Sequence, residues 1–231
     1  EGLGNKFLAN IRQTDAIVHV VRCFDDENVI HVEGSTDPIR DMDTIDLELV
    51  MADLEMVERR IDKAKKAAKG DKKFLQEAAD FEGLRDWLND GKSARTYEAV
   101  DIAQEYPDCE LLSLKPVIYA ANLDEDGFAD PHGVEYYRQV EERAQAQGAQ
   151  VIPVCAKLEA EIAELDAEEK KMFLDDLGIA ESGLDRLVKA SYSLLGLISY
   201  LTSGEDECRA WTIKRGTKAP QIGRASCRER V

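Results

Sequence analysis

The sequence has few side chains that could hold a metal ion or form a set of disulfides. Its 231 residues include only three histidines and five cysteines. The cysteines are Cys23, Cys109, Cys155, Cys208 and Cys227. No two of them form a C-x-x-C pair, and no histidine joins them in a pattern typical of zinc ligands. We therefore expect neither a zinc site nor a disulfide framework, and interpret the cysteines as reduced thiols of a cytosolic protein.

Positive charge and long apolar runs are also scarce. Thirty basic residues stand against 47 acidic ones, which gives a formal charge of -17. This balance disfavours broad attachment to nucleic acid or to anionic lipid. No apolar run approaches the roughly 18 residues of a membrane span, and the polar first residues are unlike a secretory signal. An apolar content of 44% is nevertheless enough for a globular core, so we expect a cytoplasmic protein.

Lysines gather in one stretch of this acidic chain. They are Lys63, Lys65, Lys66, Lys69, Lys72 and Lys73. Such a run is usually a solvated helix face, and a contact with RNA or the ribosome is the alternative interpretation.

Both ends of the sequence look unusual. It begins with Glu1 instead of methionine and enters a helical pattern within a few residues. Residues 222–231 contain three arginines and one cysteine, and resemble the translation of a sequencing adapter more than a genuine basic tail. We expect a chain truncated at both ends, and exclude residues 222–231 from the fold prediction.

The pattern between the ends alternates strands with helices in two blocks. Residues 16–24 form a nearly unbroken apolar, β-branched run, as expected of a parallel strand covered on both faces. His19 lies inside this run and is interpreted as a core residue more readily than as a catalyst. Residues 117–121 and 151–154 are predicted to be further strands, and the helices are expected at residues 134–147, 167–177 and 184–197. Such alternation predicts an α/β fold with a parallel sheet and ligands at the carboxyl ends of its strands.

A long helical stretch separates the two blocks. From residue 41 to residue 69 apolar side chains recur at spacings of three and four, which predicts a coiled-coil seam. Its members are Leu47, Val50, Leu54, Val57, Ile61, Ala64 and Ala68. A second stripe after Gly70 and Asp71 includes Phe74, Ala78, Phe81, Leu84 and Leu88. The two stripes predict an antiparallel helical hairpin whose seam serves packing, while its tip projects far enough to meet a partner.

The residues N-L-D-E at 122–125 follow the second strand, where a P-loop GTPase carries N-K-x-D. In that motif the aspartate accepts hydrogen bonds from guanine, the lysine stem covers the base and the asparagine supports the site. Here Leu123 replaces the lysine and the longer Glu125 replaces the aspartate, so the geometry that selects guanine is compromised. We therefore expect a preference for ATP. The alternative is that Asn122 and Asp124 merely cap the next turn.

The residues C-A-K at 155–157 strengthen this interpretation. Cys155, Ala156 and Lys157 follow the third strand and match the S-A-K loop, whose backbone amide normally contacts the base. Two motifs in the expected order are a far stronger signal than either motif alone.

Longer segments resemble one family, the YchF Obg-like ATPases. They are residues 2–12 (GLGNKFLANIR), 15–24 (DAIVHVVRCF), 122–128 (NLDEDGF), 154–160 (VCAKLEA), 200–204 (YLTSG) and 209–213 (RAWTI). The resemblance implies a P-loop NTPase (G-domain) fold with an inserted helical hairpin and the start of a β-rich TGS domain. It implies G-domain parts at 1–40 and 113–199, the inserted domain at 41–112, and the TGS domain at 200–221.

The resemblance also implies a nucleotide site. Asn122 and Leu123 would contact adenine, Glu125 would mark the altered base specificity, and Cys155, Ala156 and Lys157 would line the base pocket. The phosphate-binding loop G-x-x-x-x-G-K-S, the Mg²⁺ ligands and the catalytic residues are expected before Glu1. We therefore expect no catalytic or metal-binding residue in the chain itself, and no ATP hydrolysis by the chain alone.

At the level of the intact protein, the resemblance implies an ATP hydrolase that works slowly as a ribosome-associated switch. A membrane partner or a sequence-specific DNA partner is not expected. Two alternatives stay open at this point. One is a non-catalytic ribosome- or protein-binding module built on a nucleotide-binding fold, and the other is an Obg-type GTPase, which Leu123 and Glu125 weaken.

Overall fold

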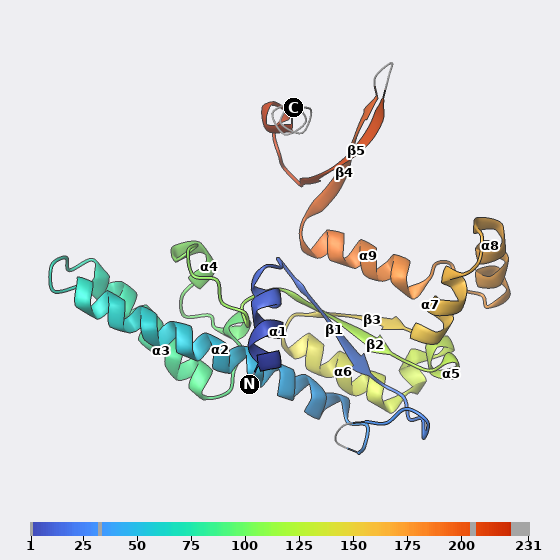
Figure 1. Ribbon diagram of the computed structural model, residues 1–231, viewed down its shortest axis with the longest axis horizontal. Coiled ribbons are helices and arrows are strands. Elements are labelled where there is room, and N and C mark those ends of the chain that lie inside the picture. The colour runs from blue at the N-terminus through green and yellow to red at the C-terminus, as the bar shows by residue number, and fades with distance from the viewer. Residues whose placement is uncertain (1, 32–33, 204–206, 223–231) are drawn as a thin grey trace. The chain divides into compact units, whose positions relative to one another are not determined.

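The computed structural model describes residues 2–31, 34–203 and 207–222 in two compact units, Glu1–Asp166 and Ala167–Val231 (Figure 1). The first unit contains a parallel sheet in the order β1-β2-β3. Its strands are β1 (Ile17–Arg22), β2 (Val117–Asn122) and β3 (Gln150–Val154). The register pairs Arg22 with Asn122 and Asn122 with Val154, so the three carboxyl ends lie side by side. The predicted strands and their parallel arrangement are confirmed.

The burial of the strands follows their place in the sheet. The central strand β2 is buried from Val117 to Ala121. In contrast, β1 is an edge strand of the described sheet, and Val18 and Val20 are 43% and 63% exposed. The prediction that residues 16–24 are covered on both faces is therefore wrong for one face of β1. His19 is half-buried against the ring of Tyr119, with 5.6 Å between ring centroids, and burial lowers the pKa of its imidazole.

The elements around the sheet begin with α1 (Gly2–Arg12) before β1. Two short helices follow strand ends, namely α5 (Glu125–Ala129) after β2 and α7 (Ala156–Ala163) after β3. Between them lie η2 (Pro131–Gly133) and α6 (Glu135–Ala146), and α6 packs on β2 and β3. The prediction for 134–147 is confirmed by α6, whereas α5 and α7 were not predicted.

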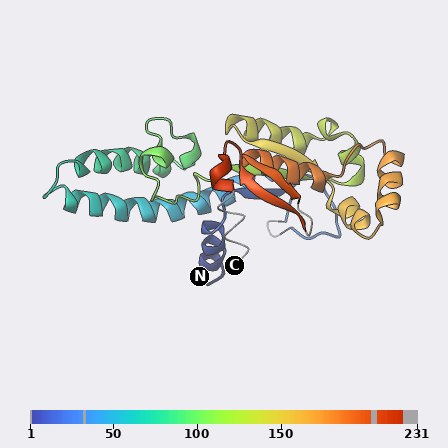
Figure 2. The same ribbon diagram turned by 90° about the horizontal axis from the view of Figure 1, so that it is seen from above.

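The predicted hairpin is formed by α2 (Pro38–Ala67) and α3 (Phe74–Asn89), which run away from the sheet (Figure 2). Asp37 caps α2 by accepting a hydrogen bond from the Arg40 N–H at 3.0 Å, and Pro38 occupies the first helical position, where its missing N–H costs nothing. The helix therefore begins before residue 41. Buried residues of the two helices form the hairpin core; they include Val50, Val57, Ile61, Phe81, Leu84 and Leu88.

One member of the predicted seam is misplaced. Leu47 is 50% exposed, whereas Met42 and Leu49 are buried. The reason is that the first turns of α2 pack on β1 and α6, and only the later turns pack on α3. The change of partner rotates the buried face of the helix.

The chain returns from the hairpin to the sheet through η1 (Ala94–Thr96) and α4 (Ile102–Glu105). A buried carboxylate holds this return segment. Asp53 of α2 has no exposed surface, and its two oxygens accept hydrogen bonds from the N–H groups of Leu112 and Ser113, each at 2.7 Å. The Ser113 hydroxyl donates a further bond at 2.6 Å. Burial raises the pKa of Asp53, against the effect of these donors.

The second unit contains α8 (Ala167–Asp176), α9 (Gly183–Leu194) and an antiparallel pair, β4 (Leu197–Ser203) and β5 (Cys208–Lys214). The predicted helix at 184–197 ends at Leu194, because Gly196 adopts a left-handed conformation with φ of 62° and the chain continues as β4. The β4–β5 pair lies where the TGS domain was expected to start. The domain boundaries themselves stay a prediction, and residues 223–231 of the expected scar lie outside the described residues.

No helix in the described part of the chain is long and apolar enough to cross a membrane. Within the same residues, no three His, Cys, Asp or Glu side chains gather in a way that could hold a metal ion.

Candidate functional site

A cavity of about 450 Å³ opens at the carboxyl ends of the three parallel strands. This is the edge at which open α/β sheets bind ligands. All six residues predicted for the site line it: Asn122, Leu123, Glu125, Cys155, Ala156 and Lys157. The structure thus brings the N-L-D-E and C-A-K segments together, although their role in nucleotide binding stays a prediction.

Asn122 joins the ends of the strands. Its backbone carbonyl accepts the Cys23 N–H at 2.8 Å, and its side-chain Oδ1 accepts the Ala156 N–H at 3.0 Å. A further backbone bond of 2.8 Å runs from the Leu123 N–H to the Val154 carbonyl. The amide side chain of Asn122 therefore fixes the first residue of α7, and with it the C-A-K segment, beside the end of β2.

The neighbouring aspartate has a different task. Asp124 is the N-cap of α5, and its Oδ1 accepts the Gly127 N–H at 2.8 Å. The capping interpretation is therefore confirmed for Asp124, while the side chain of Asn122 reaches across to the next strand. A Cβ at Gly127 would lie only 2.8 Å from Asp124 Oδ1 and 2.9 Å from Val134 Cγ2, so the close turn requires glycine.

Leu123 and Glu125 differ sharply in exposure. Leu123 is only 2% exposed, so its side chain lies in the interior at the floor of the cavity. The Glu125 side chain is 48% exposed, and its Oε1 lies 2.6 Å from Lys157 Nζ. This hydrogen-bonded ion pair raises the pKa of Lys157. Glu125 occupies the position at which P-loop GTPases carry the aspartate that reads guanine, and its carboxylate is already paired with Lys157.

Cys155 lies beneath the mouth of the cavity at the N-cap position of α7. It is 1% exposed, and burial raises the pKa of its thiol. Ala156 and Lys157 are exposed at the surface of the cavity. The segment therefore offers a small side chain and a basic one to a ligand, while its thiol stays neutral and contributes packing.

The loop after β1 supplies a wall that the sequence analysis missed. Its lining residues are Phe24, Asp25, Asp26 and Val29. Phe24 ends the predicted strand at 16–24 and the other three follow it, so the rule that ligands bind at the carboxyl ends of strands was a signal that could have found them. Phe24 adds an aromatic residue to the lining of the cavity.

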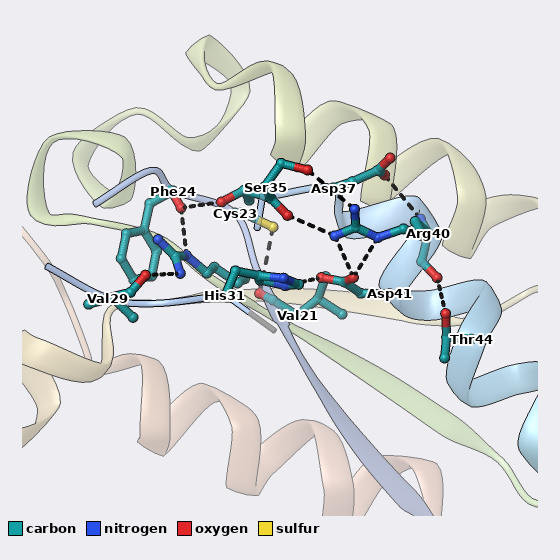
Figure 3. A network of polar contacts seen from close by, with 12 residues as sticks. Val21, Cys23, Phe24, Val29, His31, Ser35, Asp37, Arg40, Asp41 and Thr44 are labelled. Atoms are coloured by element: carbon teal, nitrogen blue, oxygen red, sulfur yellow. Dashed lines mark hydrogen bonds and ion pairs between the residues drawn. The ribbon is translucent and has the colours of Figure 1, made fainter. Parts of the chain in front are cut away.

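The same loop leads into α2 through a polar network (Figure 3). His31 Nε2 lies 2.9 Å from Asp41 Oδ2, and Arg40 bonds both Asp41 Oδ1 and the Ser35 carbonyl, at 3.1 and 2.7 Å. The residues between the cavity wall and the long helix are thus held by side-chain contacts on both sides of residues 32–33.

Comparison with known proteins gives consistent matches. No family model matches the chain. A protein named ribosome-binding ATPase YchF from Bacillus subtilis is 53% identical over 223 residues, which cover 96% of this chain and 61% of that protein. The protein of the same name from Escherichia coli O157:H7 is 46% identical over 225 residues, again with 96% and 61% covered. The chain therefore spans about three fifths of the length of these curated relatives.

A solved structure agrees with the sequence matches. The chain superposes on the structure of the Schizosaccharomyces pombe YchF GTPase with a TM-score of 0.86 and 34% sequence identity. The match covers 99% of this chain and 62% of the other. The G-domain fold expected from the sequence is thereby confirmed.

Proposed function

We propose, from the premise that the chain belongs to the YchF family, that the strand-end cavity binds the base of ATP and that the whole protein hydrolyses ATP in preference to GTP. The names of the matched proteins agree on a nucleotide hydrolase, since they include both ATPase and GTPase. The names differ on whether the nucleotide carries adenine or guanine. The residues of this chain at the base site are therefore the ones that bear on the preference.

The observation that carries the proposal is the state of Glu125. A carboxylate at this position selects guanine only if it can accept hydrogen bonds from the two donors on the guanine edge. Here Glu125 is one methylene longer than aspartate and is held 2.6 Å from Lys157 Nζ. Adenine, which presents an acceptor at N1 and a donor at N6, does not need that carboxylate. The arrangement removes the advantage of guanine without penalising adenine.

We propose that the phosphates and Mg²⁺ are bound by segments of the whole protein that correspond to the part of the relatives outside the matched 61%. The chain contains no G-x-x-x-x-G-K-[ST] sequence, whose backbone N–H groups would cradle the phosphates. The part of the reaction that these residues perform is to bind and orient the base. The chain alone should therefore release no phosphate from ATP above background.

Competition binding tests the base preference. The chain would be completed with the remaining segments of the Bacillus subtilis relative, of which it covers 61%. We expect ATP to displace a fluorescent nucleotide at a concentration at least about fivefold lower than GTP does, because the carboxylate that would accept the two guanine edge donors is paired with Lys157. Tighter binding of GTP would overturn the adenine assignment and favour the Obg-type GTPase. Phosphate release by the uncompleted chain serves as the background control.

We also propose that the whole protein binds the ribosome and that the hairpin tip contributes to this contact. The bacterial relatives are named as ribosome-binding, and the tip carries the lysine cluster of the chain. All six lysines are exposed. Lys65 pairs with Glu82 and Lys73 with Asp71, whereas Lys66, Lys69 and Lys72 form no ion pair within the described residues. These three charges are available to ribosomal RNA phosphates.

Charge reversal tests the tip. We expect Lys66→Glu, Lys69→Glu and Lys72→Glu together to weaken cosedimentation of the completed protein with ribosomes by about tenfold or more at low salt, because three phosphate contacts become repulsive. The matched control reverses three exposed lysines outside the hairpin, Lys171, Lys214 and Lys218, with the same change in net charge. Equal losses in both triple variants would mean that only net charge matters and would reject a contact at the tip.

A further inference from the structure

The wall formed by residues 24–29 has little packing of its own. Residues 25–29 are all exposed, and Val29 keeps 45% of its surface accessible. Loops with few buried contacts open easily. The wall nevertheless lines the base cavity, so some other interaction must hold it in place.

That interaction is made by Arg22, the last residue of β1. Its Nε donates to the Phe24 carbonyl at 2.9 Å, Nη1 to the Val29 carbonyl at 2.8 Å and Nη2 to the Asp26 carbonyl at 3.3 Å. Figure 3 shows Phe24 and Val29 close together, at the two ends of the wall. One guanidinium thus binds the main chain at the start, the middle and the end of the loop.

The side chain is also braced from two directions. The guanidinium carbon lies 4.8 Å from the centroid of the Phe24 ring, a cation–π contact. The backbone of Arg22 pairs with Asn122 in the sheet, directly beside the candidate base site. The strand fixes the backbone of Arg22. The planar guanidinium donates to three carbonyls that accept no hydrogen bond from a helix or a sheet.

The other tethers of the loop are bonds within it and two longer side-chain bonds from outside it, one of which runs from the Tyr136 hydroxyl of α6 to Asp25 Oδ2 at 3.2 Å. Asp26 Oδ1 accepts the Asn28 N–H at 2.8 Å, and the Asp26 carbonyl accepts the Val29 N–H at 3.2 Å. The Thr36 hydroxyl donates to the Phe24 carbonyl at a longer 3.4 Å. The contacts within the loop shape its turn, Tyr136 and Thr36 each hold one residue of it, and Arg22 binds three of its main-chain carbonyls from the end of β1.

We infer that Arg22 is a positioning residue for nucleotide binding, which holds residues 24–29 as a preformed wall of the base cavity. The inference rests on the proposed function, since it concerns how the same cavity receives its base. A preformed wall raises affinity because binding then does not have to offset the loss of conformational entropy that ordering the loop would cost. Lysine cannot replace arginine here, because its single ammonium cannot reach three carbonyls in a planar fork.

The test compares a ligand with a base and a ligand without one. In the completed protein, Arg22→Lys should weaken ATP binding by about fivefold to tenfold, through lost loop order, and leave the affinity for tripolyphosphate within about twofold. Calorimetry gives both values. Arg138→Lys, at an exposed arginine of α6, is the matched control and should change neither affinity. An equal loss for both ligands, or no loss for ATP, would overturn the inference.

Hydrogen exchange on the 231-residue chain tests the wall without any nucleotide. The amides of Asn28 and Val29, both hydrogen-bonded within the loop, should exchange about tenfold faster in Arg22→Lys than in the parent chain. Unchanged exchange would show that Arg22 does not hold the loop. Failure of the parent protein to bind ATP would instead contradict the proposed function, so the two ideas can fail separately.

Discussion

Replacing Asp53 with alanine is expected to lower the free energy of unfolding by about 3–5 kcal/mol, the largest stability effect we predict. The carboxylate is completely buried and accepts hydrogen bonds from Leu112 N–H, Ser113 N–H and the Ser113 hydroxyl, at 2.6 to 2.7 Å. Alanine removes every acceptor at once. Three donors would then remain in the interior without partners, and each unsatisfied donor costs about 1–3 kcal/mol.

The position of Asp53 explains why the effect should spread. It lies on α2 and binds residues 112 and 113, which lie five and four residues before the start of β2. Urea unfolding followed by circular dichroism gives the free energy. Asp62→Ala, at an exposed aspartate of the same helix, is the matched control and should shift it by less than about 0.5 kcal/mol. A loss below about 1 kcal/mol in Asp53→Ala would contradict the buried-acceptor account.

The second large effect is expected at Asn122. Asn122→Ala should weaken ATP binding by at least about tenfold, because the Ala156 N–H loses its acceptor and the C-A-K segment loses its link to β2. Asn122→Asp separates two roles of this side chain. The carboxylate can still accept the Ala156 N–H, but it cannot offer an amide donor to a base. A loss in both variants would indicate that the amide itself reads the base.

Much of the fold could be predicted because apolar residues recur in the sequence at the spacings typical of strands and helices. A nearly unbroken run of apolar, mostly β-branched residues identified β1, and spacings of three and four identified α2. Such patterns report how a segment is buried, yet they do not say against what. Leu47 was therefore placed on the seam although the first turns of α2 face the sheet, and Val20 was expected to be covered although β1 lies at an edge of the described sheet.

The features that escaped prediction depend on tertiary contacts. From the sequence alone, Asp53 would be placed on the surface of the helix. Nothing in its neighbours along the chain indicates that three hydrogen-bond donors from residues 112 and 113 surround it in the fold. The short helix α5 depends on the cap by Asp124, and α7 begins where Asn122 binds Ala156. The wall held by Arg22 depends on carbonyls up to seven residues away. Motif order found the two segments of the site, while their mutual contacts became visible only in the fold.

The most direct test of the central claim, that the strand-end cavity holds the base of ATP, is the ATP dissociation constant of Asn122→Ala in the completed protein. It should be measured beside that of tripolyphosphate, with Asn10→Ala at an exposed asparagine of α1 as the control. We expect Asn122→Ala to bind ATP at least about tenfold more weakly, with tripolyphosphate binding and the control unchanged. ATP binding equal to that of the parent protein would contradict the claim.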